Sequence, residues 1–285
     1  MSTLLSAART DAQWPRLALR ALRIATVVGA AVVSLAVLAK ALSARLEARA
    51  EPTHSTPSAI DVPIRVPILV YHSIAPHHPG QTAEQRELDV DTLVFQKQMQ
   101  FLVDHGYRAI PFATLVAALE GTATVPDRGV VITFDDGWAT QYHFAFPTLR
   151  RLGLTATFFV YTNGIARDHI FMSWDEVREL RDAGMTIGSH SRSHPLLTDA
   201  NVSLTDEVEG SRELITRNLG TAPDFFAYPY GEWNQRVAAA VKAAGYRAAR
   251  AYPGGVVNSR SDLFALHSVL TTDDMVAFER LLGSP

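Results

Sequence analysis

Two groups of polar residues in this sequence have the composition of a metal-dependent hydrolytic site. Asp135-Asp136-Gly137 follows the apolar run Gly129–Phe134, and His190 is separated by Ser-Arg-Ser from His194. Two histidines and one carboxylate are the typical ligands of a catalytic zinc ion, which keeps a fourth position for water. Neighbouring side chains at a strand end point in different directions, so one aspartate could bind the metal while the other acts as general base.

Other catalytic chemistries fit the sequence less well. A glycosidase needs two carboxylates that flank the sugar ~5–9 Å apart, and adjacent residues at one strand end do this badly. The sequence has no Gly-x-Ser-x-Gly elbow and no phosphate-binding loop of the Gly-Lys-Ser/Thr type. The absence of cysteine excludes thiol nucleophiles, disulfides and cysteine-bound zinc. Metal-assisted hydrolysis remains.

Short apolar strands alternate with amphipathic helices along the C-terminal three quarters of the chain. The expected strands are 67–71, 129–134, 156–161, 185–187, 224–226, 246–251 and 263–267, and the expected helices are 92–105, 112–120, 140–152, 173–183, 205–219, 234–244 and 273–282. This alternation predicts a parallel sheet with helical crossovers. We expect an α/β fold, a distorted (β/α) barrel of about seven parallel strands.

Four polar clusters come directly after expected strands. They are His72, Asp135-Asp136, His190 and Tyr228-Pro229-Tyr230. In a (β/α) barrel the carboxyl ends of the strands converge on one face, where catalytic residues gather. The sequence therefore predicts that these clusters lie close together.

The charge of the chain is unevenly distributed. The net charge is -3, and it divides into +5 for residues 1–50 and -8 for residues 51–285. Binding to nucleic acid requires clustered Lys and Arg that displace counterions from phosphates. An acidic domain without a basic stripe therefore excludes nucleic acid as a partner.

An uncharged apolar segment at residues 24–39 predicts attachment to a membrane through an N-terminal helix. Four arginines precede it, which places the N-terminus in the cytoplasm. We expect a cytoplasmic segment at 1–23, a transmembrane anchor at 24–42, a proline-rich linker at 43–66 and a catalytic domain at 67–285. The anchor would be a single pass through the cytoplasmic (inner) membrane, with the catalytic domain on the periplasmic or extracellular side.

A cleaved signal peptide is the alternative interpretation of the same segment. Small residues that suit a signal peptidase occur at 41–43 and at 48–50. The region before the apolar run is long for a signal peptide, and the second site is far from that run. We therefore favour the uncleaved anchor. If cleavage occurs, the domain is secreted.

The combined motifs resemble those of the polysaccharide deacetylases, the NodB-homology family. Thr133–Gly137, His190–Pro195 and Tyr228–Gly231 are similar to the first three motifs of this family, in its order, and the resemblance covers about residues 67–282. Residues 67–74 and 226–231 further resemble the poly-β-1,6-N-acetylglucosamine deacetylase branch. The family's fold, activity and ligands become expectations for this chain.

The resemblance implies metal-dependent hydrolysis of N-acetyl groups from an N-acetylglucosamine polysaccharide outside the cytoplasm, with release of acetate. Three alternatives remain. The chain could remove O-acetyl esters, it could act on peptidoglycan, or it could be a catalytically silent barrel that only binds carbohydrate. The silent barrel is disfavoured because both aspartates and both histidines of the motifs are present.

The resemblance also assigns roles to individual residues. Asp135 is the general base, and Asp136, His190 and His194 hold a divalent metal ion, zinc in the first place, with cobalt, nickel or iron as alternatives. The backbone N–H near Tyr230, within Tyr228-Pro229-Tyr230, helps to stabilise the oxyanion.

Two histidines compete for the role of general acid. Most of the family takes the acid from a late motif, which His267 matches in part, whereas the β-1,6 branch uses a segment similar to Tyr-His-Ser-Ile at residues 71–74. We favour His72 over His267. One departure concerns the base, since Ala227-Tyr228 stand where many members carry an arginine that orients it.

Overall fold

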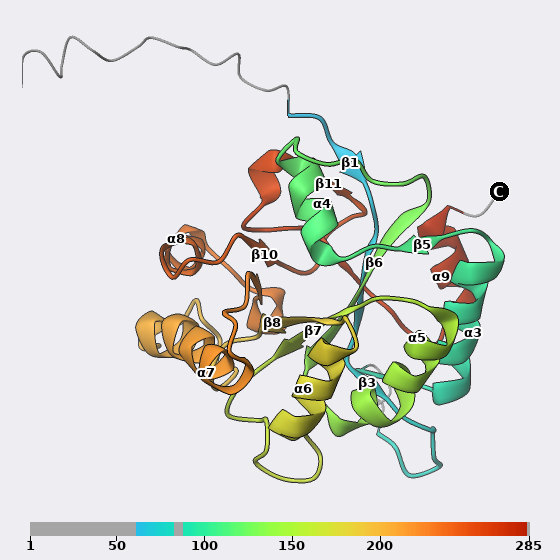
Figure 1. Ribbon diagram of the computed structural model, residues 1–285, viewed down its shortest axis with the longest axis horizontal. Coiled ribbons are helices and arrows are strands. Elements are labelled where there is room, and N and C mark those ends of the chain that lie inside the picture. Colours follow the sequence, from blue (N-terminus) through green and yellow to red (C-terminus); the bar gives the residue numbers. More distant parts are fainter. Residues whose placement is uncertain (1–60, 83–87, 284–285) are drawn as a thin grey trace, which may run out of the picture. The chain divides into compact units, whose positions relative to one another are not determined.

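A computed structural model describes residues 61–82 and 88–283 of the chain (Figure 1). The predicted N-terminal segment at 1–23 and the predicted anchor at 24–42 lie outside the described residues, as does most of the predicted linker at 43–66. Within the described ranges, no helix combines the length and the apolar character needed to cross a membrane.

Parallel strands form the centre of the domain. The main sheet has the order β10-β9-β8-β7-β6-β2-β12, and an additional strand, β5, pairs with β6. All of these pairs are parallel. The strands are β2 (Ile68–Tyr71), β5 (Arg108–Ala109), β6 (Gly129–Asp136), β7 (Thr157–Val160), β8 (Thr186–Ser189), β9 (Phe225–Ala227), β10 (Ala248–Arg250) and β12 (Val269–Leu270).

The sheet curls into a half-barrel, which confirms the predicted α/β fold with about seven parallel strands. One end strand, β10, contacts the segment that precedes the other end strand, β12, through an isolated parallel bridge between Arg250 and Leu266. Two small sheets lie beside it. One pairs β1 (Ile64–Arg65) with β11 (Val257–Asn258), and the other pairs β3 (Ser73–Ile74) with β4 (Asp89–Val90). The end of the predicted linker is therefore already part of the folded domain.

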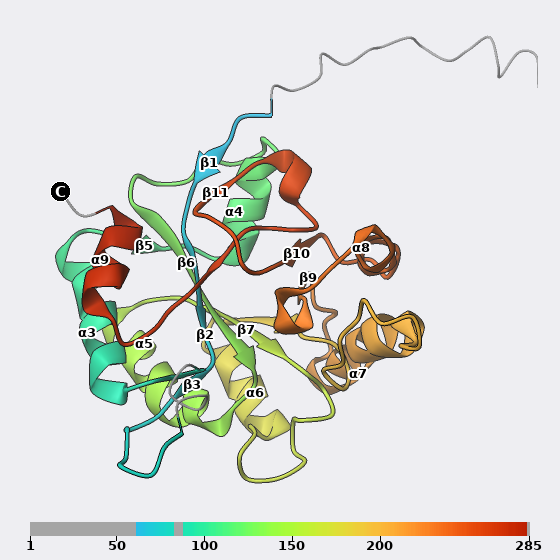
Figure 2. The ribbon, with the colours of Figure 1, turned by 180° about the vertical axis from the view of Figure 1, so that it is seen from behind.

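Of the seven α-helices in the described residues, six cover the outside of the curled sheet (Figures 1 and 2), and the seventh, α4 (Phe112–Leu119), packs against the opposite face of the strands, beside Val131 and Phe159. The six outer helices are α3 (Thr92–Asp104), α5 (Phe146–Leu152), α6 (Trp174–Asp182), α7 (Gly210–Leu219), α8 (Gln235–Ala243) and α9 (Met275–Leu282). Two of the predicted helices begin differently from an ordinary α-helix. Five-residue π-helices, η1 (Gln141–Ala145) and η2 (Thr205–Glu209), precede α5 and α7 directly.

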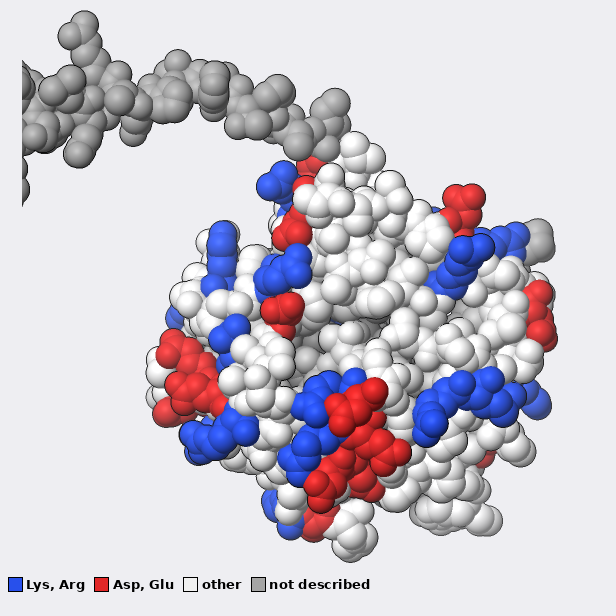
Figure 3. Space-filling model, viewed as in Figure 1, with Lys and Arg blue, Asp and Glu red and all other residues white. Residues whose placement is uncertain are grey.

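Helix α6 illustrates how the sequence specifies these helices. The Ser173 side chain accepts a hydrogen bond from the Glu176 N–H, and the Glu176 carboxylate accepts one from the Ser173 N–H in return, so a capping box begins the helix. Val177 and Leu180 are buried against the sheet side. The acidic and basic residues of α6 lie on its outer face (Figure 3), so the helix is amphipathic.

The predicted strand at 263–267 is wrong. Residues Arg260–Asp262 form the 3-10 helix η4, begun by a capping box between Ser259 and Asp262, and the chain turns after it. The last strand of the sheet forms later, at Val269–Leu270, where the backbone pairs with β2. A local side-chain turn therefore prevails over the apolar pattern of this segment.

The centre of the core is aromatic. Tyr71 of β2, Phe134 of β6 and Phe158 of β7 lie on neighbouring strands, and Phe95 of α3 packs against them. The Phe134 and Phe158 rings are stacked with their centroids 4.7 Å apart, and the Tyr71 and Phe134 centroids are 5.5 Å apart. These four side chains are fully buried. They fix the mutual position of the strands whose ends carry the polar clusters.

We expect Phe158→Ala to lower the free energy of unfolding by about 3–5 kcal/mol, because it removes a fully buried ring and leaves a cavity. Chemical denaturation measures the change. Phe144→Ala is the matched control, since that ring is 36% exposed and its loss should cost much less. Equal losses for the two variants would contradict this description of the core.

Candidate active site

The register of the strands brings the polar clusters to one edge of the sheet. Tyr71 pairs with Phe134, so His72 is level with Asp135. On the other side of β6, Asp136 pairs with Val160, which pairs with Ser189, the residue before His190. The prediction that the clusters after the strands lie together is therefore confirmed for His72, the two aspartates and His190.

Asp136, His190 and His194 form a compact group that could hold a metal ion. One ligand atom from each of the three residues lies within 4.8 Å of the others. The Nε2 atoms of His190 and His194 are 3.6 Å and 3.3 Å from Asp136 Oδ1. One carboxylate oxygen and two imidazole nitrogens are a donor set suited to zinc and to neighbouring transition metals. The predicted ligand set therefore fits a divalent metal.

Two further contacts orient these ligands. His190 Nδ1 lies 2.7 Å from the backbone oxygen of Ala227, so it carries the proton and leaves Nε2 as the free nitrogen. The indole N–H of Trp138 donates a hydrogen bond of 2.9 Å to Asp136 Oδ2, so Oδ1 is the oxygen that faces the histidines. Outer contacts of this kind fix the direction of metal ligands.

The protonation states suit metal binding at Asp136 and His190, whereas His194 must lose a proton when a metal binds. Burial alone would raise the pKa of Asp136, but the hydrogen bond with His194 and the charge of His190 hold it well below its ordinary value. Burial lowers the pKa of His190 to about 4, against the opposing effect of Asp135. Burial would also lower the pKa of His194, but the hydrogen bond with Asp136 and the negative charges of Asp136 and Asp135 together outweigh it and raise the pKa. At neutral pH, His190 is therefore neutral and Asp136 is charged.

Asp135 is buried beside the metal ligands and is paired with an arginine. A guanidinium nitrogen of Arg250, on β10, donates a hydrogen bond to Asp135 Oδ2. Arg250 is only 2% exposed, and its other terminal nitrogen donates to Ser268 Oγ at 3.2 Å. Asp135 Oδ1 has no hydrogen-bond partner within the described part of the chain. The arginine thus holds one carboxylate oxygen and leaves the other free.

His72 lies on the far side of Asp135 from the β8 strand. Its Nε2 is 3.9 Å from Asp135 Oδ2, and its side chain is 18% exposed. Gln141, from η1, holds the two backbones together, because its side-chain N–H groups donate to the carbonyl oxygens of His72 and Asp135 at 2.9 Å and 2.5 Å. The two candidate proton-transfer residues are therefore fixed relative to each other.

The three residues after β9 take different positions. The Tyr230 ring packs edge-on against His194 with a centroid distance of 4.7 Å, and Tyr230 has φ of +60°. Tyr228, in contrast, is buried in the core, and its hydroxyl donates to the backbone oxygen of Phe264. Pro229 is buried in the short helix η3 (Pro229–Gly231). Of the three, Tyr230 is the residue that contacts a predicted metal ligand with its side chain.

The structure separates His267 from this cluster. Val269 pairs with Leu69, so the parallel register places His267 level with Pro67, at the opposite end of β2 from His72. With ~3.3 Å per residue, the five residues from 67 to 72 span roughly 16 Å. His267 instead contacts the backbone of β11, with its Nδ1 3.1 Å from the Val257 oxygen. Of the two candidate acids, His72 is the one beside Asp135.

Gly137 allows the chain to leave β6 directly after the two aspartates. Its φ is +87°, in the left-handed region. A Cβ atom here would lie 2.6 Å from the side chain of Ile165 and 3.2 Å from that of Val160. Any other residue would be strained here, both by the positive φ and by the lack of space for its Cβ atom.

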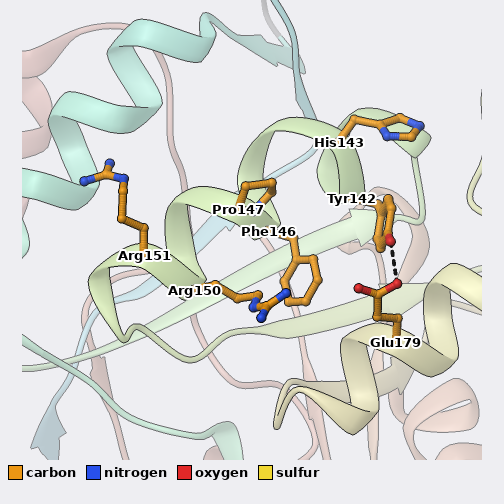
Figure 4. A pocket seen from close by; sticks show the side chains of 7 residues that line it. All are labelled: Tyr142, His143, Phe146, Pro147, Arg150, Arg151 and Glu179. Carbon is orange, nitrogen blue, oxygen red and sulfur yellow. Dashed lines mark hydrogen bonds between the residues drawn. The ribbon is translucent and has the colours of Figure 1, made fainter.

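A separate hollow of about 520 Å³ lies between α5 and α6 on the outside of the sheet (Figure 4). Tyr142 and Phe146 point toward α6 there, and the Tyr142 hydroxyl donates to Glu179. None of the predicted catalytic or metal-binding residues lines it. The hollow is therefore distinct from the cluster at the strand ends.

The sequence assigned no role in the site to Gln141 or Arg250, and it did not identify Trp138 as the partner of Asp136. Arg250 had a partial signal, because the predicted strand at 246–251 contains two arginines, Arg247 and Arg250, and an arginine on the buried side of a strand requires a negative partner. Arg250, on β10, pairs in register with Ala227 of the neighbouring strand β9. The neighbouring strand thus supplies an arginine at the level where the resemblance had suggested that one was missing.

Comparison with known proteins agrees with this geometry. Residues 122–249 match the family model described as polysaccharide deacetylase. YxkH of Bacillus subtilis (strain 168), whose name places it among the polysaccharide deacetylases, is 27% identical over 214 residues, which are 75% of this chain and 74% of YxkH. The poly-beta-1,6-N-acetyl-D-glucosamine N-deacetylase of Staphylococcus aureus (strain MRSA252) is 26% identical over 219 residues, 71% of this chain and 74% of that relative.

The fold also resembles that of a solved structure. The Streptococcus pyogenes deacetylase PplD in complex with acetate matches with a TM-score of 0.69 and 26% identity, over 75% of this chain and 95% of that chain. The family-model match contains all three motifs on which the sequence resemblance rested. That resemblance is therefore confirmed.

We expect the His190 ring to titrate near pH 4 in the metal-free protein, because burial disfavours the imidazolium ion. At pH 6 the ring should be neutral with its proton on Nδ1, while His194 still carries a positive charge. Long-range proton–nitrogen NMR correlation spectra report both the charge and the tautomer. A His190 ring that titrates at 6.5 or above would contradict the described environment.

Proposed function

The chain carries a polysaccharide deacetylase domain, and from this we propose that it hydrolyses N-acetyl groups of an extracytoplasmic N-acetylglucosamine polysaccharide in a metal-dependent reaction that releases acetate. The observation that carries the proposal is the arrangement around Asp136, His190 and His194. Their ligand atoms converge within 4.8 Å, and Asp135 and His72 lie directly beside them. This arrangement combines a metal-binding group, a base and an acid.

Asp136, His190 and His194 would hold the metal ion. When bound, such an ion polarises the acetyl carbonyl and makes water more acidic. The neutral Nε2 of His190 and the charged Asp136 carboxylate are in the states that metal binding requires. The metal identity is part of the proposal, with zinc in the first place and cobalt, nickel or iron as alternatives.

Asp135 serves as general base in this account. Arg250 anchors its Oδ2, and the same oxygen is 3.9 Å from Nε2 of both His190 and His72, so the carboxylate is held beside the metal group, where it can take the proton of the attacking water. Water adds to the acetamide carbonyl, and the backbone N–H at Tyr230 helps to stabilise the oxyanion that develops.

His72 donates the proton that the departing amine needs. It stands next to Asp135, and Gln141 holds both backbones in place. Cleavage of the carbon–nitrogen bond then yields acetate and the free amine of the sugar. The two proton transfers are thus assigned to side chains that come from adjacent strands, β2 and β6.

Two observations support a polymer outside the cytoplasm as the substrate. The uncharged segment at 24–39, preceded by arginines, is typical of an anchor that leaves the following domain outside the membrane. The Staphylococcus aureus relative is named for poly-beta-1,6-N-acetyl-D-glucosamine. A tethered enzyme with a proline-rich spacer suits a polymer better than a diffusible metabolite.

Acetate release by the purified full-length chain tests the proposal. We expect release from β-1,6- or β-1,4-linked N-acetylglucosamine oligomers, loss of activity in chelator, and recovery when zinc is restored. Asp136→Asn should bring activity to background, whereas Asp206→Asn, at an exposed side chain of η2, should leave it unchanged. Full activity of Asp136→Asn would refute the metal assignment. Release from acetyl esters or peptidoglycan alone would replace the substrate, and glycan binding without release would indicate a silent barrel.

The general acid can be assigned by a pair of matched variants. We expect His72→Asn to lower kcat by about 10²–10⁴-fold, because proton donation to the amine is lost. His267→Asn should retain wild-type kcat, since the register places it at the opposite end of β2. Steady-state kinetics on the same oligomer measures both variants. The reverse result would assign the acid to His267.

A further inference from the structure

The loop between the two histidine ligands has a conformation that its sequence does not favour. His190 to His194 spans five residues, and two of them, Ser191 and His194, have φ of +69° and +61°. Residues other than glycine rarely adopt the left-handed region, and they persist there only when their surroundings hold them. The spacing of the ligands therefore depends on contacts from outside the loop.

Hydrogen bonds to the loop backbone come from several directions. The His190 N–H donates to the Val160 oxygen of β7, and the N–H of Asn163 donates to the Arg192 oxygen at 2.8 Å. The His194 N–H donates to Ser191 Oγ within the loop. The N–H of Thr162 and the hydroxyl of Tyr230 also donate to the Ser191 and His194 oxygens, and a further contact is made by one carboxylate from another element.

That carboxylate belongs to Glu207. Its Oε2 accepts hydrogen bonds from the consecutive N–H groups of Arg192 and Ser193, at 3.0 Å and 2.8 Å. Its Oε1 accepts a bond of 2.5 Å from the Ser193 hydroxyl. Two successive N–H groups that converge on one anionic oxygen form a strong, directional contact. Glu207 is 8% exposed, so water competes little for these donors.

Glu207 reaches the loop from the π-helix η2, which precedes α7. The neighbouring Val208 is buried as well, whereas Asp206 and Glu209 on the same turn are exposed. A π-turn adds one residue to a helical turn, and such turns are frequent at functional sites. In η2 the widened turn buries two consecutive side chains: Val208 packs in the core, and Glu207 lies against the ligand loop.

We propose that Glu207 is a positioning residue that sets the spacing of the metal ligands His190 and His194. It acts through the backbone of Arg192 and Ser193, and it touches neither the substrate nor the metal. The inference rests on the proposed metal-dependent function. It goes further, because it assigns the geometry of the ligand loop to a residue outside the three motifs.

Zinc affinity of the full-length chain tests the inference, measured by competition with a chromogenic chelator at pH 7.5. We expect Glu207→Ala to weaken zinc binding about 10–100-fold, the usual loss when a partner of the ligands is removed. Glu207→Gln keeps one acceptor oxygen, so its loss should be smaller. The visible spectrum of the cobalt-substituted protein should change in Glu207→Ala, because the ligand geometry changes.

Two control variants separate positioning from general stability. Glu209→Gln removes an exposed carboxylate from the same turn and should bind zinc like the wild type. Val208→Ala removes buried packing from the same turn, so it should lower the Tm of the metal-free protein while zinc affinity stays within a few-fold.

Two results would overturn the inference while the proposed function stands. One is wild-type zinc affinity and an unchanged cobalt spectrum in Glu207→Ala. The other is an equal loss of affinity in Val208→Ala at an equal loss of Tm. A wild-type chain that binds no zinc would instead overturn the metal site, and this inference with it.

Discussion

Two adjacent carboxylates, Asp135 and Asp136, are buried at the end of β6, and this constraint governs the rest of the site. A buried charge is costly unless it is paired. The charges of the two aspartates are compensated by different partners. Asp135 is paired with Arg250 across the sheet, and Asp136 faces two imidazoles and receives the indole N–H of Trp138. The different environments give two neighbouring residues of the same type different roles.

The fold meets this constraint through the register of parallel strands. His72, Asp135 and His190 come from three strands, and the backbone pairing places all of them at one edge of the sheet. The aromatic core beneath, around Phe134 and Phe158, holds these strands in place. The π-turns η1 and η2 then direct Gln141 and Glu207 to the backbone of the site. Side chains from these turns thus add contacts to the strand ends and to the ligand loop.

The sequence was sufficient for the parallel fold and for the ligand group, because both depend on local patterns. Apolar runs that end in polar residues identify strand ends, and HxxxH with an aspartate pair is a specific combination. Arg250 and Glu207 could not be assigned in this way, since neither belongs to a strand-end cluster or to the HxxxH motif, and their contacts depend on strand register and on the π-turn. The strand expected at 263–267 failed for a related reason, because a capping box at Ser259 redirects the chain.

The most direct test of this account is anomalous X-ray diffraction at the zinc edge from crystals of the zinc-loaded protein. The account predicts one strong peak, ~2.0–2.1 Å from the Nε2 atoms of His190 and His194 and ~2.0–2.2 Å from an oxygen of Asp136. Asp135 should remain paired with Arg250 and stay out of the coordination shell. A peak held by Asp135 in place of Asp136, or zinc bound only at other residues, would contradict the division of roles between the two aspartates.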